Sequence, residues 1–389
     1  MVALPQELVH IIVGLVDATD ICSLRAFALV SPSFRVASQL ILFRALTLKG
    51  HVRPGNYLAA SRLLTRSPHI GAYVREVTIE LPLATYDNAI KGIPTALATL
   101  TAVQRCIIDG GTGDQFVWNY LLCEAIVEFV SRQPLRYLHL CAVKAIPLPA
   151  FIQLATSSPA LFFSSVALQD TTAQNPPPAR LLLITELSLD NGTGDISTLL
   201  SHEGHAPPLR HLSVHYGLAT LPLIIGAARS LEYMRFGSPA TEIDPISIPP
   251  LPSLRSFEIE VDFDQHAAPW VRDALAAILR SKLNPPGGAV LASPSCPLEE
   301  ITITYLPVWE SPPPSSSAYI EFLAQLDRTL SSLARTPRLR WRLRFVGTGR
   351  EVRFARLVGF IAEHMPQMDA LDRLVFETYE PKKWNGEFL

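Results

Sequence analysis

The sequence predicts an α/β protein in which a small three-helix bundle over residues 1–50 precedes a solenoid of short strands and helices over residues 51–389. Two patterns carry this prediction. Apolar residues recur at helical spacing in three stretches near the amino terminus. From about residue 74 a short apolar strand pattern recurs, with helical stretches between its copies. The 33 prolines make up roughly 8% of the chain, against a usual ~5%, and favour many short elements over long ones.

Three amphipathic helices are expected at the amino terminus. The first begins near Pro5, because proline lacks the N–H that would be unpaired in a first helical turn. Its apolar positions recur at helical spacing at Leu8, Ile11, Ile12, Leu15 and Val16. Asp17 or Thr19 can cap a second helix, and Ser31-Pro32 provides both a cap and a proline start for a third. A bundle of this size has too small a core to be very stable alone.

The order of residues in this bundle resembles an F-box. The segment begins Leu4-Pro5-Gln6-Glu7-Leu8, like the usual L-P-x-E-L start, and continues to Val30-Ser31-Pro32-Ser33-Phe34, where Pro32 replaces the commoner basic residue of V-S-[RK]-x-[WF]. The resemblance implies a hydrophobic surface that docks onto a Skp-type adaptor of a cullin–RING ubiquitin ligase. By match to the motif, that surface or its supporting core comprises Leu4, Pro5, Leu8, Ile11, Leu15, Ile21, Leu24, Leu29, Val30 and Phe34. The alternative is that these residues are only the core of a helical cap on a larger domain.

A strand pattern of the form L-x-x-[LVIFM]-x-[LVIF] recurs along the rest of the chain. The copies are Val74-Val77-Ile79, Leu135-Leu138-Leu140, Ile184-Leu187-Leu189, Leu209-Leu212-Val214, Leu231-Met234-Phe236, Leu254-Phe257-Ile259, Leu298-Ile301-Ile303 and Leu371-Leu374-Phe376, with weaker copies at Val103-Cys106-Ile108 and Leu161-Val166-Leu168. Successive copies centred on residues 187, 212, 234 and 257 are 25, 22 and 23 residues apart. These steps fall within the ~20–29 residues of leucine-rich repeats, while wider steps elsewhere require insertions.

Helical stretches are expected between the strands, at residues 56–66, 117–131, 270–282, 319–335 and 351–365. A short strand and helix cannot bury their apolar faces alone, but stacked neighbours can. We therefore expect an irregular leucine-rich-repeat-like solenoid, with strands on the concave face and helices outside. A doubly wound α/β sheet is the alternative, although its strands would be longer and more continuously apolar. An F-box followed by irregular leucine-rich repeats is similar to fungal, basidiomycete-like F-box proteins.

Proline-rich and serine-rich segments interrupt this pattern at residues 171–180, 284–297 and 311–317. The strand pattern resumes after each of them, so we interpret them as surface loops rather than domain boundaries.

Two groups of histidines suggest metal sites, but neither has suitable spacing. His202-Glu203-Gly204-His205 is not the helical H-E-x-x-H pattern, because its glycine and the prolines that follow disfavour a helix. His211 and His215 lie on the polar side of one predicted strand and are about 13 Å apart at ~3.3 Å per residue, too far to share one metal. We expect solvated histidines, no metal and no cofactor.

Two glycine pairs follow apolar strands, as phosphate-binding loops do. Gly111-Thr112-Gly113-Asp114 and Gly192-Thr193-Gly194-Asp195 both lack a third glycine and the lysine of a P-loop, so we interpret them as turns. The chain also has no G-x-S-x-G motif and no recognisable Cys/His signature. We therefore do not expect an enzyme.

Two predicted strands alternate apolar residues with like charges. Within residues 257–264 apolar residues alternate with carboxylates, and within residues 338–345 they alternate with arginines. Because side chains of a strand alternate between its two faces, each charged row lies on one face. In a solenoid that face is the concave one, where targets usually bind. An arginine row can grip acidic or phosphorylated segments through forked hydrogen bonds. Alternatively, the two rows are ordinary polar faces that partly compensate each other. The candidate target-binding residues are Arg338, Arg340, Arg342, Arg344, Glu258, Glu260 and Asp262.

Composition narrows the class of protein. A net charge of −2 argues against a nucleic-acid binder, and the absence of an apolar run of eighteen residues argues against a membrane span. Five scattered cysteines without a C-x-x-C pair indicate a reducing, intracellular compartment, cytoplasmic or nuclear.

We expect a non-catalytic, substrate-recruiting subunit of an SCF-type ubiquitin ligase. Its partners would be a Skp-type adaptor, a cullin scaffold and an unknown protein target. The alternative is an interaction scaffold whose F-box-like bundle engages no cullin complex. An enzyme built on an α/β fold is disfavoured by the missing catalytic motifs.

Overall fold

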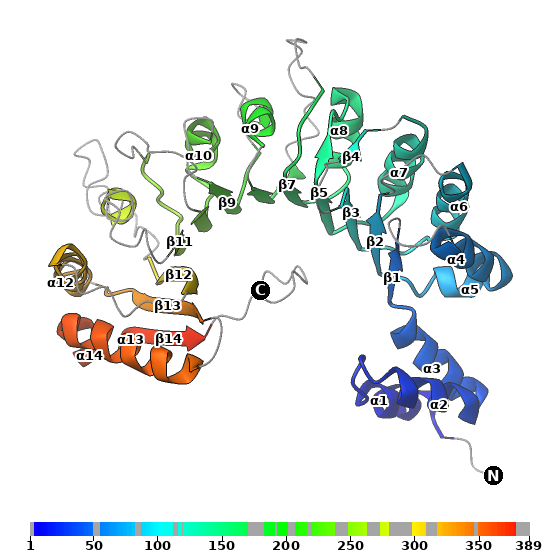
Figure 1. Ribbon diagram of the computed structural model, residues 1–389, viewed down its shortest axis with the longest axis horizontal. Helices are drawn as coiled ribbons and strands as arrows, with labels where there is room; N and C mark the ends of the chain where they lie inside the picture. The colour runs from blue at the N-terminus through cyan, green and yellow to red at the C-terminus, as the bar shows by residue number, and fades with distance from the viewer. Residues whose placement is uncertain are drawn as a thin grey trace. The chain divides into compact units, whose positions relative to one another are not determined.

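The computed structural model describes residues 4–49, 55–81, 87–111, 116–118, 120–169, 183–190, 193–200, 207–215, 220–237, 248–262, 273–279, 298–308, 317–333, 335–345 and 349–378. It confirms the α/β class: the described residues alternate strands with helices, with twelve parallel strands in one order and two more in a separate parallel pair (Figure 1). The chain divides into two compact units: Met1–Ile184 with Asp190–Ile196, and Thr185–Leu189 with Ser197–Leu389. None of the described helices has the length and apolar character needed to cross a membrane.

The first unit opens with three helices, α1 (Gln6–Gly14), α2 (Ile21–Val30) and α3 (Pro32–Leu42). Ser31 accepts a hydrogen bond from the backbone N–H of Phe34 at 3.4 Å, with Pro32 in the first turn, as its position predicts. The cap of α2 is Asp20, which accepts from the N–H of Ser23 at 3.0 Å, so the prediction of Asp17 or Thr19 was wrong. Asp17 instead accepts from Thr19 in the turn between the helices.

Strands then alternate with helices through the rest of the first unit. The parallel strands follow the order β1 (Ala45–Leu48), β2 (Glu76–Glu80), β3 (Arg105–Asp109), β5 (Tyr137–Cys141) and β7 (Ala160–Ser164). The helices are α4 (Gly55–Arg66), α5 (Pro68–Gly71), α6 (Asp87–Ala98), α7 (Tyr120–Arg132) and α8 (Leu148–Ala155). A separate parallel pair joins β4 (Phe116–Val117) to β6 (Val143–Lys144).

The second unit continues the alternation. Its parallel strands follow the order β8 (Glu186–Leu189), β9 (His211–His215), β10 (Tyr233–Gly237), β11 (Ser256–Asp262), β12 (Glu300–Val308), β13 (Arg338–Phe345) and β14 (Leu374–Thr378). Its helices include α10 (Leu221–Ala227), α12 (Ser317–Ser331), α13 (Arg350–His364) and α14 (Pro366–Ala370), and the division between the units falls within α9 (Gly194–Leu200). Every described strand therefore pairs with strands that are close to it in chain order.

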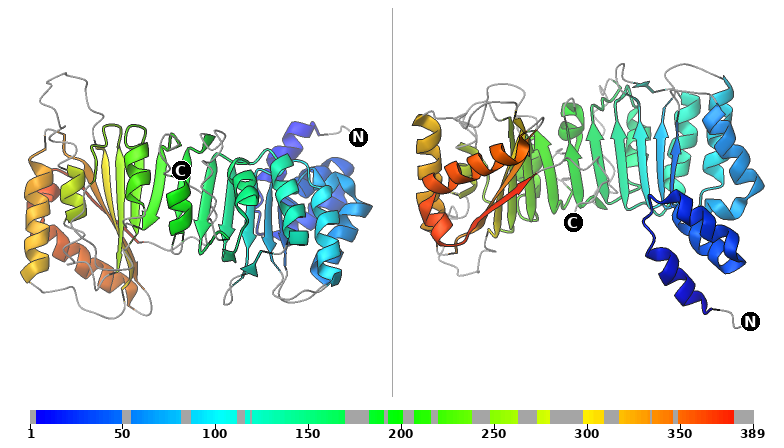
Figure 2. Two further views of the ribbon diagram at one scale, coloured as in Figure 1. Left: turned by 90° about the horizontal axis from the view of Figure 1, so that it is seen from above. Right: turned by 60° about the horizontal axis from the view of Figure 1, so that its bottom comes forward.

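In each unit the helices that alternate with the strands lie along one face of them, whereas α1 to α3 form a bundle apart from that face (Figure 2). The strand residues on that face are buried, such as Val77 and Ile79 of β2, and alternate with less buried residues on the opposite face. In the second unit the helix-facing side holds Trp341, which is fully buried and stacks on Tyr305 with ring centroids 5.7 Å apart. The charged rows at alternate positions consequently point away from the helices.

Some predicted boundaries were wrong. Sequence analysis missed β1, whose Leu48 is fully buried. The weak copy at 161–168 contains β7 only as far as Ser164; its later apolar residues are buried beyond the strand, where Leu168 bridges to Ile146. The helix predicted from Val117 begins at Tyr120, because Val117 belongs to β4.

Several sequence predictions fall wholly or largely outside the described residues. They are the proline-rich loops, the His202–His205 group, Thr112–Asp114, Gly192, and the ends of the helix predicted over 270–282, of which residues 273–279 are helical.

Candidate functional site

The first candidate site is an apolar stripe on α1. Leu8, Ile11, Ile12 and Leu15 are all exposed, up to 82% for Leu15, and Leu4 extends the stripe beyond the helix. These positions recur at helical spacing, so they share one side of α1. The helix instead contacts its neighbours through Val9 and Val13, which are 1% and 0% exposed. Of the five positions that periodicity marked as the apolar side of this helix, four therefore face solvent, and Val16 is partly buried against the core.

Helix α2 has the same division. Ile21, Leu29 and Val30 are exposed at 48%, 83% and 65%, whereas Leu24 is fully buried against Val9, Val13 and Ala37. Phe34 of α3 is half-buried, packs against this core and stacks on Phe27 with ring centroids 5.6 Å apart.

The structure thus separates the ten residues of the F-box resemblance into two groups. Leu24 and Phe34 belong to or support the small core, and the other eight are exposed. We name the exposed apolar side chains Leu4, Leu8, Ile11, Ile12, Leu15, Ile21, Leu29 and Val30 the apolar stripe. Ile12 was not among the residues matched to the motif. It is exposed because α1 turns Val9 and Val13, and not Ile12, towards the core.

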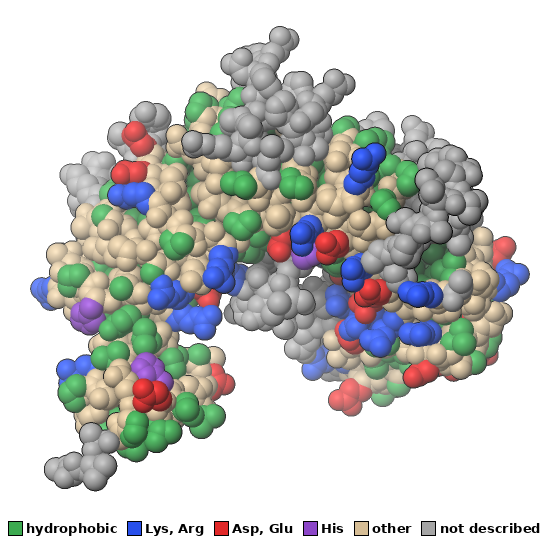
Figure 3. Space-filling view, turned by 180° about the vertical axis from the view of Figure 1, so that it is seen from behind, with side chains coloured by type: hydrophobic (Ala, Val, Ile, Leu, Met, Phe, Trp, Pro, Cys, Tyr) green, Lys and Arg blue, Asp and Glu red, His purple; other side chains and the backbone are tan. Residues whose placement is uncertain are grey.

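The concentration of these residues distinguishes the amino-terminal helices from the rest of the described chain. Among the large hydrophobic side chains that the structure describes as exposed, the eight of the apolar stripe lie within 27 residues, against six others spread from Leu63 to Leu371. Hydrophobic side chains gather on this part of the surface, at the lower left of Figure 3. Single exposed apolar residues are ordinary in soluble proteins, but a gathered set marks an interaction surface.

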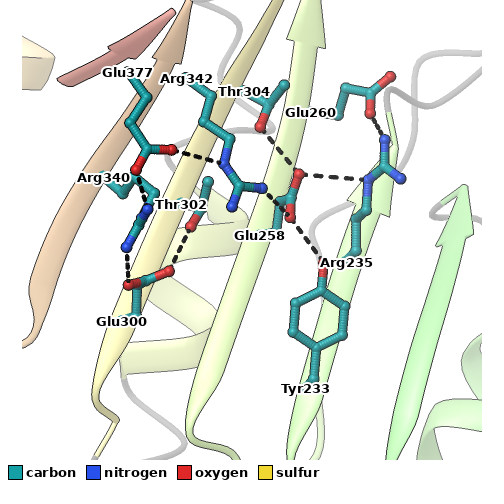
Figure 4. Close-up of polar contacts among 10 residues, drawn as sticks. All are labelled: Tyr233, Arg235, Glu258, Glu260, Glu300, Thr302, Thr304, Arg340, Arg342 and Glu377. Atoms are coloured by element: carbon teal, nitrogen blue, oxygen red, sulfur yellow. Dashed lines mark hydrogen bonds and ion pairs between the residues drawn. The ribbon is translucent and has the colours of Figure 1, made fainter. Parts of the chain in front are cut away.

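The second candidate site is the strand face of the second unit that points away from the helices. Ten side chains from β10 to β14 form a polar network there (Figure 4): Tyr233, Arg235, Glu258, Glu260, Glu300, Thr302, Thr304, Arg340, Arg342 and Glu377. Strand register explains the meeting, because β12 separates β11 from β13 by one strand and β14 follows β13 directly.

Glu258 is the most heavily bonded carboxylate of this polar network. It accepts hydrogen bonds from the Tyr233 hydroxyl at 2.8 Å, the Thr304 hydroxyl at 3.0 Å and the Arg342 guanidinium at 3.2 Å, and Arg235 lies 3.7 Å away. Its side chain is only 9% exposed, so these bonds replace the water that burial removes. Burial and the Glu258 carboxylate raise the pKa of the Tyr233 phenol, which keeps its proton available for this bond.

The arginines of β13 are also paired within the chain. Arg340 contacts Glu300 at 3.0 Å and also pairs with Glu377, while the Nε of Arg342 lies 3.5 Å from Glu377. The acidic and basic rows compensate each other only in part, as the second interpretation of these strands predicted, because Arg342–Glu258 joins the two rows while Glu300 and Glu377 lie outside the acidic row. Sequence analysis missed Glu300 and Glu377, because each is a single carboxylate in its strand and only the strand order brings it beside an arginine.

The polar network also covers the face of β12 that points away from the helices. Thr302 and Thr304 are 2% and 1% exposed although they point away from the helices, and the side chains of Arg340 and Arg342 reach from β13 to carboxylates on β12 and β11. The arginine row is thus not a free set of cations. Arg338 at the start of the row is exposed, whereas the side chains of Arg344 and Asp262 lie outside the described residues.

The corresponding face of the first unit carries aromatic side chains. Tyr137 stacks on Phe162 with ring centroids 4.6 Å apart, and the Arg105 guanidinium lies 4.7 Å from the Tyr137 ring. His139 meets both aromatic rings edge-on. Burial lowers the pKa of His139 to about 4, so this imidazole is neutral at physiological pH.

Among the described residues, no three His, Cys, Asp or Glu side chains are arranged to hold a metal ion. His211 lies 3.4 Å from Glu186 on the neighbouring strand. Gly111 has a positive φ of 92°, and its N–H donates to Asp109 in a turn that leaves β3.

No protein-family model matches this chain, and a search of curated proteins finds no sequence that matches it.

Proposed function

We propose that this protein is the substrate-recruiting, non-catalytic subunit of an SCF-type cullin–RING ubiquitin ligase. Helices α1 to α3 act as an F-box that docks a Skp-type adaptor. The alternating strands and helices act as an irregular leucine-rich-repeat-like solenoid that holds a target protein. The complex would work in the cytoplasm, the nucleus or both.

The observation that carries this proposal is the apolar stripe. Seven of its eight residues coincide with positions of the F-box resemblance, and all eight are exposed. Leu15 and Leu29 are more than four-fifths exposed, and burying a leucine side chain in an interface gains roughly 1.5–3 kcal/mol. The buried core of this small helical unit contains only Val9, Val13, Leu24 and Ala37. The unit therefore exposes more large apolar side chains than it buries.

An interaction scaffold that engages no cullin complex remains the second candidate, because an apolar surface of this kind also suits other helical partners. The two candidates differ in what accompanies the protein. A ligase subunit brings both the adaptor and, through it, the cullin, whereas the scaffold brings neither.

Co-purification tests the proposal. The full chain is tagged and co-expressed with a Skp-type adaptor and its cullin, beside a Leu4→Ala/Pro5→Ala variant. We expect wild type to retain both partners and the variant to lose both, because these two exposed residues anchor the start of the docking surface. An Ile225→Ala/Val352→Ala variant provides the control, since these side chains are exposed on α10 and α13 instead. Equal recovery of the adaptor by all three proteins would refute the F-box assignment.

A further inference from the structure

The side chain of Glu377 has an unusual position within the polar network. One carboxylate oxygen contacts Nη1 of Arg340 and the other lies 3.5 Å from Nε of Arg342. A single anion is thus held between two guanidinium groups that stand side by side on β13 (Figure 4). Paired guanidinium groups hold carboxylates and phosphates in the same way when these anions come from another molecule.

Glu377 is also the network carboxylate that solvent reaches most easily. Its side chain is 38% exposed, compared with 25% for Glu300, 15% for Glu260 and 9% for Glu258. Glu258 is likewise held by two arginines, but it also accepts from Tyr233 and Thr304. Among the described residues no hydroxyl group donates to Glu377, and β14 stands at the end of the strand order. Of the two carboxylates that are each held by two arginines, Glu377 is therefore the easier to displace.

We propose that Glu377 is an internal ligand of a two-arginine anion site, and that an anionic side chain of an extended target segment, a carboxylate or a phosphate, binds Arg340 and Arg342 by replacing it. This inference rests on the proposed function, because it names the chemistry by which the solenoid takes its target. Glu377 limits binding to segments whose anion competes with a carboxylate already present in the site.

The row gives such a segment a defined spacing. Arg338, Arg340 and Arg342 occupy alternate positions of one strand, about 6.6 Å apart. Alternate side chains of an extended peptide have the same repeat, so one anion can replace Glu377 while a second, two residues away, approaches the exposed Arg338.

The charges around the site set the strength of this competition. Glu258 and Glu300 stay in place and hold the two guanidinium groups in position, which reduces the entropy lost when a ligand binds. They also repel an incoming anion, so a ligand succeeds only by taking the place of Glu377. A phosphate, with more oxygens and more charge than a carboxylate, is the stronger competitor.

Fluorescence anisotropy tests the inference with three dye-labelled heptapeptides on the full chain at low salt. One carries phosphoserine and an aspartate two residues apart, the second carries two aspartates at these positions, and the third is uncharged. Glu377→Gln removes the internal charge while keeping the side-chain shape, and should tighten binding of an anionic peptide about tenfold. Arg342→Gln in the same background should abolish it. Comparison of the first two peptides shows whether phosphate or carboxylate is the ligand.

Glu299→Gln is the matched control, because Glu299 pairs with Arg255 in an exposed ion pair outside the network. Thermal melts verify folding, and Glu377→Thr, which keeps a residue suited to a strand, replaces Glu377→Gln if that variant melts early. Equal affinity of wild type and both Glu377 variants for the anionic peptides, or an equal gain in Glu299→Gln, would overturn the inference. Adaptor co-purification on the same proteins separates the two proposals, since it should not change with any of these substitutions.

Discussion

The amino-terminal helices expose apolar side chains, whereas the strand face of the second unit partly buries charged ones. On α1, α2 and the residues that flank α1, eight large apolar side chains are exposed, and the small core beside them is made by other residues. On β10 to β14, charged side chains that would be expected in water are instead drawn together and half-buried. The apolar side chains of the first region are left without a partner surface among the described residues, whereas most charged side chains of the second region are paired with each other.

The two candidate surfaces therefore differ in what a partner would gain by binding them. An apolar surface that the fold leaves open gains free energy when a partner covers it, so it indicates constitutive docking. A charged surface that is already paired gains little from a partner unless the partner displaces an internal group. From this contrast we expect the helices to dock a partner directly and the strand face to bind a target only by displacing an internal group.

The largest effect is expected where apolar residues are buried in the usual way. Trp341→Ala should lower the free energy of unfolding by about 3–5 kcal/mol, because it removes a fully buried ring that stacks on Tyr305. Leu15→Ala, at a side chain 82% exposed, should change it by less than about 0.5 kcal/mol. Urea denaturation of both variants measures the contrast. Similar losses of stability would mean that Leu15 belongs to a core.

The next effect concerns the polar network. Reversing Arg340 and Arg342 to glutamate should destabilise the protein by about 1–3 kcal/mol, because Glu258, Glu300 and Glu377 would lose cations and face like charges. Arginines that were exposed and unpaired would cost little on reversal. Arg255→Glu, in an ion pair that is more than half exposed on both sides, should cost less than about 1 kcal/mol and serves as the control. A network reversal that melts like wild type would show that its ion pairs contribute nothing to stability.

A smaller effect extends the comparison to the first unit, where His139 carries no charge at neutral pH. Its pKa of about 4 lies below the ordinary 6.5, chiefly through burial; Arg105 also lowers it, while Asp109 and Asp190 oppose the shift. Between these pKa values the unfolded chain binds the proton and the folded chain does not, so acidification from 6.5 towards 4 destabilises the fold. The loss should reach about 1 kcal/mol near pH 6.

Denaturant melts at stepped pH measure this loss, with His139→Asn as the control. The substitution should flatten the dependence of stability on pH in this window. An unchanged pH dependence in His139→Asn would place the responsible group elsewhere.

Sequence reasoning identified most strands, because period two and the recurring apolar triplet are local signals. It also identified α1 to α3 from helical spacing and from the cap at Ser31. It could not tell which side of α1 faces the core, since Val9 and Val13 are as apolar as Leu8, Ile11 and Leu15. That choice depends on how α2 and α3 pack against the helix, which no local pattern records.

The polar network was predictable only in part for a similar reason. The rows on β11 and β13 are visible as alternations in single strands, and their mutual compensation was one of two open interpretations. Glu300 and Glu377 have no such pattern, and their roles depend on register between strand residues that are 35 or more positions apart in sequence. Non-local pairing of this kind leaves no signal in a short window.

The most direct test of the central claim is titration calorimetry of the purified full chain with a purified Skp-type adaptor at several temperatures. We expect wild type to bind with a negative heat-capacity change, the signature of apolar burial, and Leu15→Ser/Leu29→Ser to lose binding while its unfolding curve stays that of wild type. Ile225→Ser/Val352→Ser, at exposed apolar residues of the second unit, should bind like wild type. Undiminished binding by Leu15→Ser/Leu29→Ser would contradict the claim that the apolar stripe is the adaptor surface.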